Sequence, residues 1–192
     1  MENLIRVEVQ AVVGVDLGDR SSQICCLSRE TGAILEEKRL STTTASFQRY
    51  FEGRVSCLVI VETGTHTPWV RRLLASMGHQ VIVANASKVR AISASVRKTD
   101  ERDARYLAQL GRVDPELLSP VHTRSEEAQQ ALAVVRSREG LVKARTMLIN
   151  QVRGMVKSFG ARLPSCSAKS FARGASKALP QGLKAALEPL LE

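Results

Sequence analysis

Four acidic residues occupy positions that solubility alone does not explain. Asp16 ends the apolar run AVVGV and Glu62 ends the apolar run SCLVIV, so both carboxylates close candidate buried strands. Asp100 and Asp103 follow in a basic segment, and their three-residue spacing places them on one face of a helix. Burying a charge without compensation costs several kcal/mol. Converging acids repel one another unless a cation lies among them, and carboxylate ligands of this kind favour Mg²⁺ or Mn²⁺.

Phosphodiester chemistry is what such a site performs. Two divalent ions a few ångströms apart activate the attacking oxygen and stabilise the leaving oxygen. Simpler interpretations stay open for each acid. Asp16 can be a turn residue, Glu62 can cap the helix that follows it, and the two later aspartates can be exposed charges paired with Arg97 or Arg105. Asp19 is an alternative metal ligand, although its turn context favours a structural role.

The sequence carries a surplus of positive charge. Lys and Arg number 28 against 19 Asp and Glu, which gives a formal net charge of +9 and a pI near 9.9. A balance this basic predicts a polyanionic partner, and nucleic acid is the partner whose backbone such cations hold over a metal site. The candidate phosphate contacts are Asn85, Lys88, Arg90, Arg97, Lys98 and Arg105. A solvated basic face is the alternative interpretation of these residues.

Hydrophobic patterning predicts an α/β domain with a mixed sheet. Strands are predicted within 5–17, with a buried run at 11–15, and at 22–29, 33–40, 56–62 and 80–84; helices are predicted at 44–53, 68–77 and 99–111. The first three strands form antiparallel hairpins, with Gly32 in the second turn. The strand, helix and strand over 56–84 imply a parallel pair with a right-handed crossover.

A long helix is predicted from Ser125 to about Phe159, after a proline-containing linker over 113–124. Apolar residues repeat every seven positions along it, as in Leu141, Leu148 and Met155, over about three heptads. This spacing predicts a coiled coil or dimerisation arm; packing on its own domain is the alternative. The tail, 161–192, is expected to contain at best two short helices and to depend on a partner outside this chain for its packing.

The apolar runs are all too short for a membrane helix, which needs roughly 20 residues, and the N-terminus lacks the pattern of a signal peptide. These features predict a soluble, cytoplasmic protein. The four cysteines show no metal-ligand spacing, and we expect them to be reduced and mostly buried. They are Cys25, Cys26, Cys57 and Cys166.

The ordered motifs resemble those of a known family. They are Gly14-Val15-Asp16, Val61-Glu62-Thr63-Gly64, Asn85 followed by Lys88, and Lys98-Thr99-Asp100 with Asp103-Ala104. Together they resemble the N-terminal DEDD domain of IS110-type transposases, which has a RuvC-like, ribonuclease-H-like fold. The resemblance covers roughly residues 11–160. It implies three parts: a catalytic domain at 1–118, a linker and oligomerisation helix at 119–160, and a basic tail at 161–192.

The resemblance also implies an activity and partners. A member of this family is a DNA recombinase of an insertion sequence, guided by a structured RNA, with Asp16, Glu62, Asp100 and Asp103 as the quartet that binds Mg²⁺ or Mn²⁺. Its coiled coil mediates assembly, here as a homodimer or tetramer, and its second, C-terminal domain carries a catalytic serine.

The sequence departs from the family pattern at Glu192, where that second domain would begin or continue. We therefore expect a fragment or a truncated transposase that does not complete strand exchange alone. Two other functions stay open: a nuclease of the Holliday-junction type, and a non-catalytic basic adaptor that binds nucleic acid through structural acids.

Overall fold

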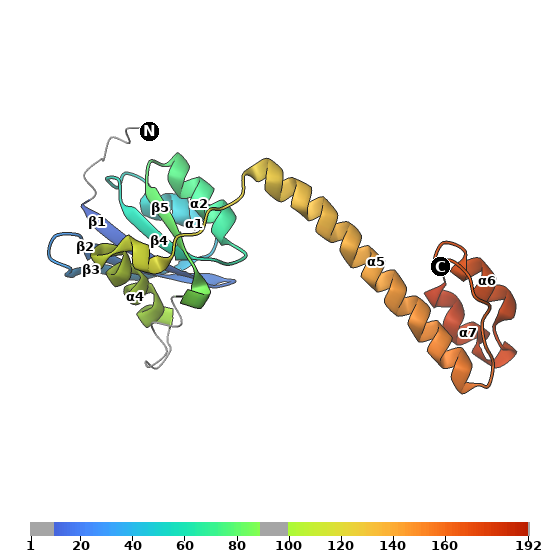
Figure 1. Cartoon of the computed structure of the whole chain (residues 1–192). Helices are drawn as coiled ribbons and strands as arrows, with labels where there is room; N and C mark the ends of the chain where they lie inside the picture. Colours follow the sequence, from blue (N-terminus) through green and yellow to red (C-terminus); the bar gives the residue numbers. More distant parts are fainter. Residues whose placement is uncertain (1–9, 89–99, 192) are drawn as a thin grey trace. The chain divides into compact units, whose positions relative to one another are not determined.

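The computed structural model describes residues 10–88 and 100–191. It divides into two compact units, with the boundary between Arg124 and Ser125. The first unit is the predicted α/β domain and the second is helical (Figure 1).

The first unit contains a five-stranded sheet in the order β3-β2-β1-β4-β5. The strands are β1 (Ala11–Leu17), β2 (Ser21–Ser28), β3 (Ile34–Ser41), β4 (Leu58–Glu62) and β5 (Gln80–Ala84). β1 to β3 pair antiparallel, whereas β4 pairs parallel with both β1 and β5. The turn before β3 includes Gly32 at φ +74°, a left-handed conformation that glycine adopts without strain. The predicted mixed sheet is confirmed.

Helices cover the two faces of this sheet with different side chains. On one face, α1 (Thr44–Phe51) and α2 (Thr67–Ser76) pack against Val13 and Val15 of β1 and their neighbours. On the other face, α4 (Asp100–Val113) packs against Val12 and the corresponding residues of β4. Alternate residues of a strand point to opposite faces, so β1 and β4 are apolar on both.

The segment predicted as a linker is mostly bound to the first unit. α4 continues to Val113, and a 3₁₀ helix follows at Pro115–Leu118. Leu118 is fully buried in the core on the α4 face. The backbone N–H of Val121 donates to Val83 O at 2.8 Å, and that of Asn85 donates to Leu118 O at 3.0 Å. An apolar leucine between two prolines therefore anchors a segment whose composition alone suggested a flexible connection.

The second unit consists of a long helix and a small helical cluster. α5 (Glu126–Ser158) begins where the capping pattern predicts, because the Ser125 side chain accepts a hydrogen bond from Ala128 N. α6 (Phe171–Ala178), α7 (Lys184–Leu187) and two 3₁₀ turns at Gln181–Leu183 and Glu188–Leu190 follow.

The tail buries its apolar residues against the end of α5. Phe171, Ala175 and Leu179 pack with Val152 and Val156 in one cluster. Leu183 and Leu187 complete it. The expectation that the tail needs a partner outside this chain is therefore wrong, since its apolar side chains already cover the last turns of the long helix.

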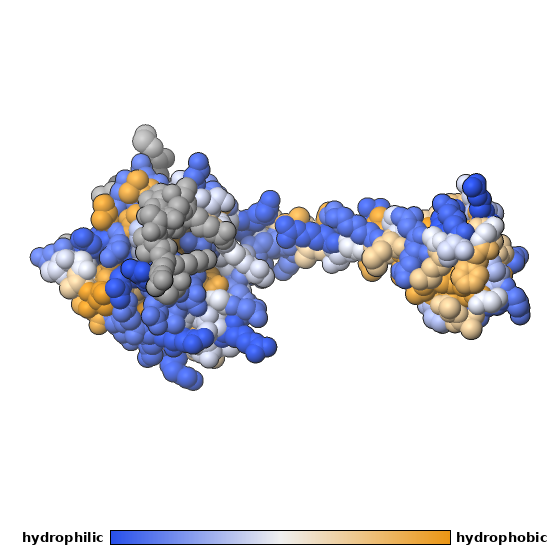
Figure 2. Space-filling model, turned by 90° about the horizontal axis from the view of Figure 1, so that it is seen from below, coloured by the Kyte–Doolittle hydropathy of each residue, from blue (hydrophilic) through white to orange (hydrophobic). Residues whose placement is uncertain are grey.

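The middle of α5 has a different character. Val152 and Val156 are the buried residues of this helix within the described part of the chain, whereas Val134, Leu141 and Met147 are 71%, 73% and 62% exposed. Figure 2 shows hydrophobic residues at intervals along a mainly hydrophilic helix. None of the described helices is long and apolar enough to cross a membrane.

Candidate functional site

The strand ends place two carboxylates side by side. β1 and β4 are parallel neighbours with Val15 opposite Val61, so Asp16 and Glu62 follow at adjacent positions where both strands end. Both side chains lie on the α4 face, because Gly14 and Ile60, two residues earlier in each strand, contact that helix. Both carboxylates are half-buried. The fold therefore brings Asp16 and Glu62 together at one end of the sheet, on the face that α4 covers.

Two glycines fix the direction and closeness of α4. A Cβ on Gly14 would lie 2.0 Å from Ala104 O, and a Cβ on Gly111 would lie 2.5 Å from a side-chain carbon of Ile60 and 3.5 Å from Val12. The later helix residue meets the earlier part of β1, so α4 runs antiparallel to that strand. Its first turn therefore extends toward the end of β1 that carries Asp16.

The first turn of α4 contains the other two predicted ligands. Asp100 is exposed, Asp103 is half-buried, and Glu101 between them is exposed. Acids in this turn are stabilised by the positive end of the helix dipole. The described residues contain no group of three or more His, Cys, Asp or Glu side chains spaced to hold a metal ion. The four carboxylates thus share a face and an end of the sheet without forming a closed ligand set.

Hydrogen bonds hold the chain around Glu62. The Thr67 hydroxyl donates to the Glu62 carbonyl oxygen at 2.5 Å, which ties the end of β4 to the start of α2. His66 Nδ1 accepts a hydrogen bond from the indole N–H of Trp69 at 3.1 Å, and His66 Nε2 lies 3.6 Å from Asp19 Oδ1.

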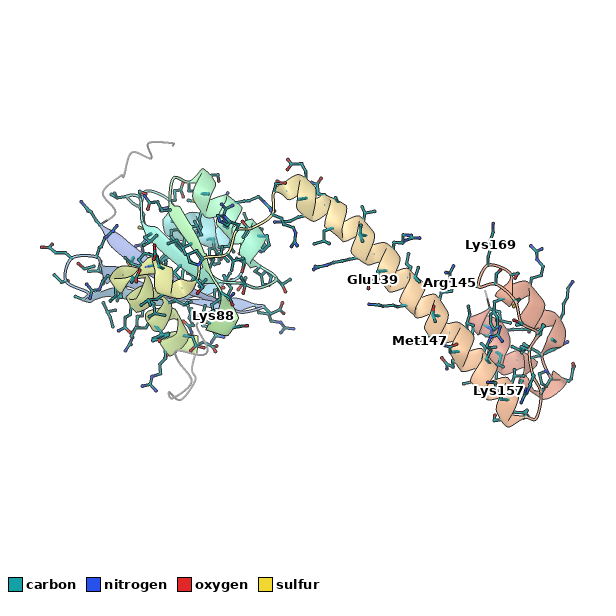
Figure 3. The ribbon with its side chains drawn as sticks, viewed as in Figure 1. Lys88, Glu139, Arg145, Met147, Lys157 and Lys169 are labelled. Carbon is teal, nitrogen blue, oxygen red and sulfur yellow. The ribbon has the colours of Figure 1, made fainter. Side chains whose placement is uncertain are left out.

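The predicted nucleic-acid contacts divide into three groups. Asn85 and Lys88 are described: Asn85 Oδ1 accepts from Ser87 N at 3.1 Å and from Lys88 N at 3.4 Å, and Lys88 is exposed (Figure 3). Arg105 is described and its guanidinium binds both oxygens of Glu37, so a phosphate contact there would compete with an ion pair. The remaining three lie outside the described residues: Arg90, Arg97 and Lys98.

The cysteines are free thiols, as expected. Cys25, Cys26 and Cys57 are buried and Cys166 is half-buried. Burial raises the pKa of the Cys25 thiol to about 11, and the nearby Glu37 carboxylate adds to this rise. This thiol is therefore protonated at neutral pH.

The chain is similar in sequence to known transposases. A family model of IS110-type DEDD transposases, described as "Transposase", matches residues 13–160. The transposase for insertion sequence element IS1111A of Coxiella burnetii is 27% identical over 154 residues, which are 78% of this chain and 39% of that protein. A probable family 20 transposase of Pseudomonas aeruginosa is 30% identical over 149 residues, which are 77% of this chain and 42% of that protein.

The transposase for insertion sequence element IS1328 of Yersinia enterocolitica is 27% identical over 154 residues, covering 80% of this chain and 44% of that protein. The chain thus spans about two fifths of the length of the curated relatives it matches. Among solved structures, Thermus thermophilus RuvC in complex with a Holliday junction substrate is 13% identical, with a TM-score of 0.40, over 52% of this chain and 90% of that chain.

A mixed sheet with acids at two parallel strand ends, in a chain matched over most of its length by a transposase model, defines a transposase domain. The chain belongs to the IS110-type family of DEDD transposases.

Proposed function

We propose that this chain supplies the metal-dependent site with which a transposase cleaves and exchanges the DNA strands of an insertion sequence. Asp16, Glu62, Asp100 and Asp103 are its acidic residues, with Mg²⁺ or Mn²⁺ as the ion. One observation carries the proposal: both strand-end carboxylates lie on the face covered by α4, at the end of the sheet toward which its acidic first turn extends.

The donor set fits such an ion chemically. All four residues offer carboxylate oxygens, which are the ligands that Mg²⁺ and Mn²⁺ prefer. Half-burial of Asp16, Glu62 and Asp103 gives a partly desolvated setting in which like charges gain from a shared cation. Because the described residues form no closed group of three ligands, binding would require the carboxylates to move toward one another.

The residues of the chain would act mainly by holding and orienting. A bound divalent ion supplies Lewis-acid activation of a phosphoryl oxygen and of the attacking oxygen. Asp16 and Glu62 are carried by buried strands, which gives their backbones little freedom. The contact of Gly14 with α4 and the hydrogen bond from Thr67 to Glu62 O fix the elements that bear the acids.

Nucleic acid would be held beside the acids by polar and basic residues. Asn85 and Lys88 follow the end of β5, next to the strand that ends in Glu62. We include the other predicted contacts, Arg90, Arg97, Lys98 and Arg105, in this proposal. The partners are the DNA of the element ends and target and a structured guide RNA, with the bacterial nucleoid as the place of action.

Assembly through α5 is the remaining part of the proposal. The exposed valines, leucines and methionines on this helix repeat at heptad spacing, which suits a homodimer or tetramer joined by a coiled coil.

Metal binding by the purified chain tests the site. Mg²⁺ or Mn²⁺ at about ten times its dissociation constant should raise the melting temperature of the first unit by about 4 °C. Asp16→Asn and Glu62→Gln should abolish most of this rise. Glu52→Gln is the matched control, because this exposed carboxylate lies at the end of α1, on the other face of the sheet. No metal effect on the parent chain, or an equal effect on all variants, would exclude the site.

A second measurement separates the proposed partners. Binding of the chain to a branched DNA junction and to a structured RNA should be compared across salt concentrations, because both depend on phosphate contacts. Tight RNA binding supports guidance by RNA. Binding to branched DNA alone supports a junction nuclease, and nucleic-acid binding without any metal effect supports a non-catalytic adaptor.

A further inference from the structure

The second unit has a long stretch that contains cations and no acids. Between Gly140 and Leu187 the sequence has no Asp or Glu. The cations of this stretch are Lys143, Arg145, Arg153, Lys157, Arg162, Lys169, Arg173, Lys177 and Lys184. Charges of both signs are normally interspersed on the surface of a protein, so a stretch of one sign marks a surface with an anionic partner.

The packing of α6 directs its cations outward. Phe171 and Ala175 on one side of the helix are buried against α5. Arg173 and Lys177, one turn apart, are exposed, and Lys169 is exposed in the turn that precedes the helix. Figure 3 shows Lys169 extending away from the packed helices. Arg173 and Lys177 are four residues apart on the helix, which is about 6 Å along its axis, and Lys169 precedes them in the turn that leads into α6. We call these three cations a row.

Most of the cations in this unit are available for a partner. Arg153 is occupied internally, since its guanidinium lies 5.2 Å from the Phe171 ring centroid and donates to Pro164 O at 3.4 Å. Lys143 pairs with Glu139 at 2.7 Å. Within residues 100–191, no ion pair joins Lys169, Arg173 or Lys177 to a carboxylate.

A phosphate backbone fits this surface better than a lipid membrane does. Peripheral membrane helices insert an apolar face below their cationic face. The apolar face of α6 is already covered by Val152 and Val156 of α5, so α6 presents charge without an apolar face to insert. Exposed Lys and Arg side chains in a row are suited to sequence-independent contacts with successive phosphates.

We infer that the helical cluster at the end of the second unit binds duplex DNA through its phosphates, with Lys169, Arg173 and Lys177 as the contacting row. This inference rests on the proposed function for the choice of DNA, and it adds a DNA contact that does not involve the carboxylates or a metal ion. The contact is electrostatic and carries no base specificity.

Fluorescence anisotropy tests the inference. The full chain is titrated against a labelled duplex of about 30 base pairs, which offers many phosphates, in buffer that contains EDTA. The triple variant Lys169→Gln, Arg173→Gln and Lys177→Gln should bind at least about tenfold more weakly, and the slope of log K against log salt should fall by about 2.7. The control triple variant removes the same charge from α5: Arg136→Gln, Arg138→Gln and Lys143→Gln. It should bind within about threefold of the parent chain.

Several outcomes would overturn the inference. Equal losses in the two triple variants would assign binding to net charge, and unchanged binding in the first variant would place the contact elsewhere. Loss of binding to a structured RNA or to phosphatidylserine vesicles, with duplex DNA binding unchanged, would identify a different partner. Circular dichroism of both variants checks that the helices are intact. Asp16→Asn should bind DNA normally in EDTA, so failure of the metal site and failure of this surface are distinguishable.

Discussion

Arg105 of α4 binds Glu37 of β3 in a bidentate ion pair. Arg105 Nη2 lies 2.9 Å from Glu37 Oε1 and 3.0 Å from Oε2, and Arg105 Nε lies 3.0 Å from Oε1. This pair connects the acidic end of α4 to the edge strand, across β1 and β2. Both side chains are about 40% exposed, so solvent screens the attraction and the pair contributes little to stability. Arg105 lies two residues after Asp103 in α4, so we infer that the pair restrains the helix turn that carries Asp103.

Breaking this ion pair should weaken metal binding more than it weakens the fold. Glu37→Gln should leave the melting temperature nearly unchanged and weaken Mn²⁺ binding roughly threefold to tenfold, because residues that orient ligands typically affect affinity. Calorimetric titration with Mn²⁺ measures this. Glu52→Gln, at the end of α1 on the other face, is the control and should keep the affinity of the parent chain. An unchanged affinity in Glu37→Gln would show that the pair does not position the site.

Adding a methyl group to Gly14 should destabilise the first unit. The new Cβ would lie 2.0 Å from Ala104 O, which is backbone and cannot rotate away, so α4 must shift. Gly14→Ala should lower the free energy of unfolding by about 3 kcal/mol, at the upper end for overpacking. The fluorescence of Trp69, the single tryptophan, reports urea unfolding of this unit.

The control for this substitution is Gly154→Ala. A Cβ at this position in α5 meets nothing within 4 Å, so the change should favour the helix and leave the Trp69 transition at the same urea concentration. A Gly14→Ala protein with unaltered stability would mean that α4 does not pack on β1 at this distance. Weaker Mn²⁺ binding by Gly14→Ala under conditions where it is folded is expected as well, since the shift moves Asp103.

Acidification should destabilise the first unit through His79. This side chain is 5% exposed, and its Nδ1 accepts a hydrogen bond from Cys57 N at 3.2 Å. Burial lowers the pKa of His79, the backbone of Phe51 opposes this effect, and the nearby Arg54 charge lowers the pKa further. The unfolded chain therefore binds the proton more readily than the folded chain. The contribution of neutral His79 to the free energy of unfolding is fully present above the ordinary histidine pKa of 6.5. It is lost as the pH decreases from there toward the lower pKa of His79 in the folded chain.

Urea unfolding followed by Trp69 fluorescence between pH 8 and about pH 5 measures this dependence. His79→Gln should be less stable than the parent chain at both ends of the range, because packing against Phe51 is lost, and its stability should change less with pH. The range stops above the region where Glu36 titrates: burial raises its pKa, but hydrogen bonds from Arg54 and Tyr50 outweigh that effect and lower it. An equal pH dependence in parent and variant would assign the effect to another group.

The sequence predicted the elements of the first unit well because its strands are short apolar runs bounded by clear turns. The β–α–β pattern indicated that β4 and β5 are parallel, and the carboxylates at strand ends indicated where a site lies. The helix that covers each face of the sheet could not be predicted in the same way. The local sequence around Gly14 and Gly111 does not indicate that α4 packs in backbone contact with β1. This close approach depends on residue pairs that are far apart in the sequence.

The ion pair of Arg105 with Glu37 and the packing of the tail escaped prediction for the same physical reason. Arg105 belongs to a run of cations whose composition predicts phosphate contacts. In the structure it binds the carboxylate of Glu37, which lies 68 residues earlier in the sequence. Phe171 lies in a sequence rich in Ala, Ser and Lys, and its burial depends on Val152 and Val156 at the end of α5. Long-range pairs of this kind leave no local periodicity.

The exposed apolar residues of α5 should mediate self-association. Leu141 is 73% exposed and Val134, one heptad earlier, is 71% exposed, and no described residue of the chain buries them. Leu141→Lys should therefore leave the helix content of the chain unchanged while reducing its molar mass in light scattering from that of a dimer or tetramer to that of the 21.0 kDa monomer.

Asn150→Lys is the matched control: it adds the same charge at an exposed position nine residues away, which is half a turn around the helix from Leu141. Because the heptad seam lies on the Leu141 side, the control should keep the mass of the parent chain. Equal masses for the parent chain and Leu141→Lys would leave these side chains without a role in assembly.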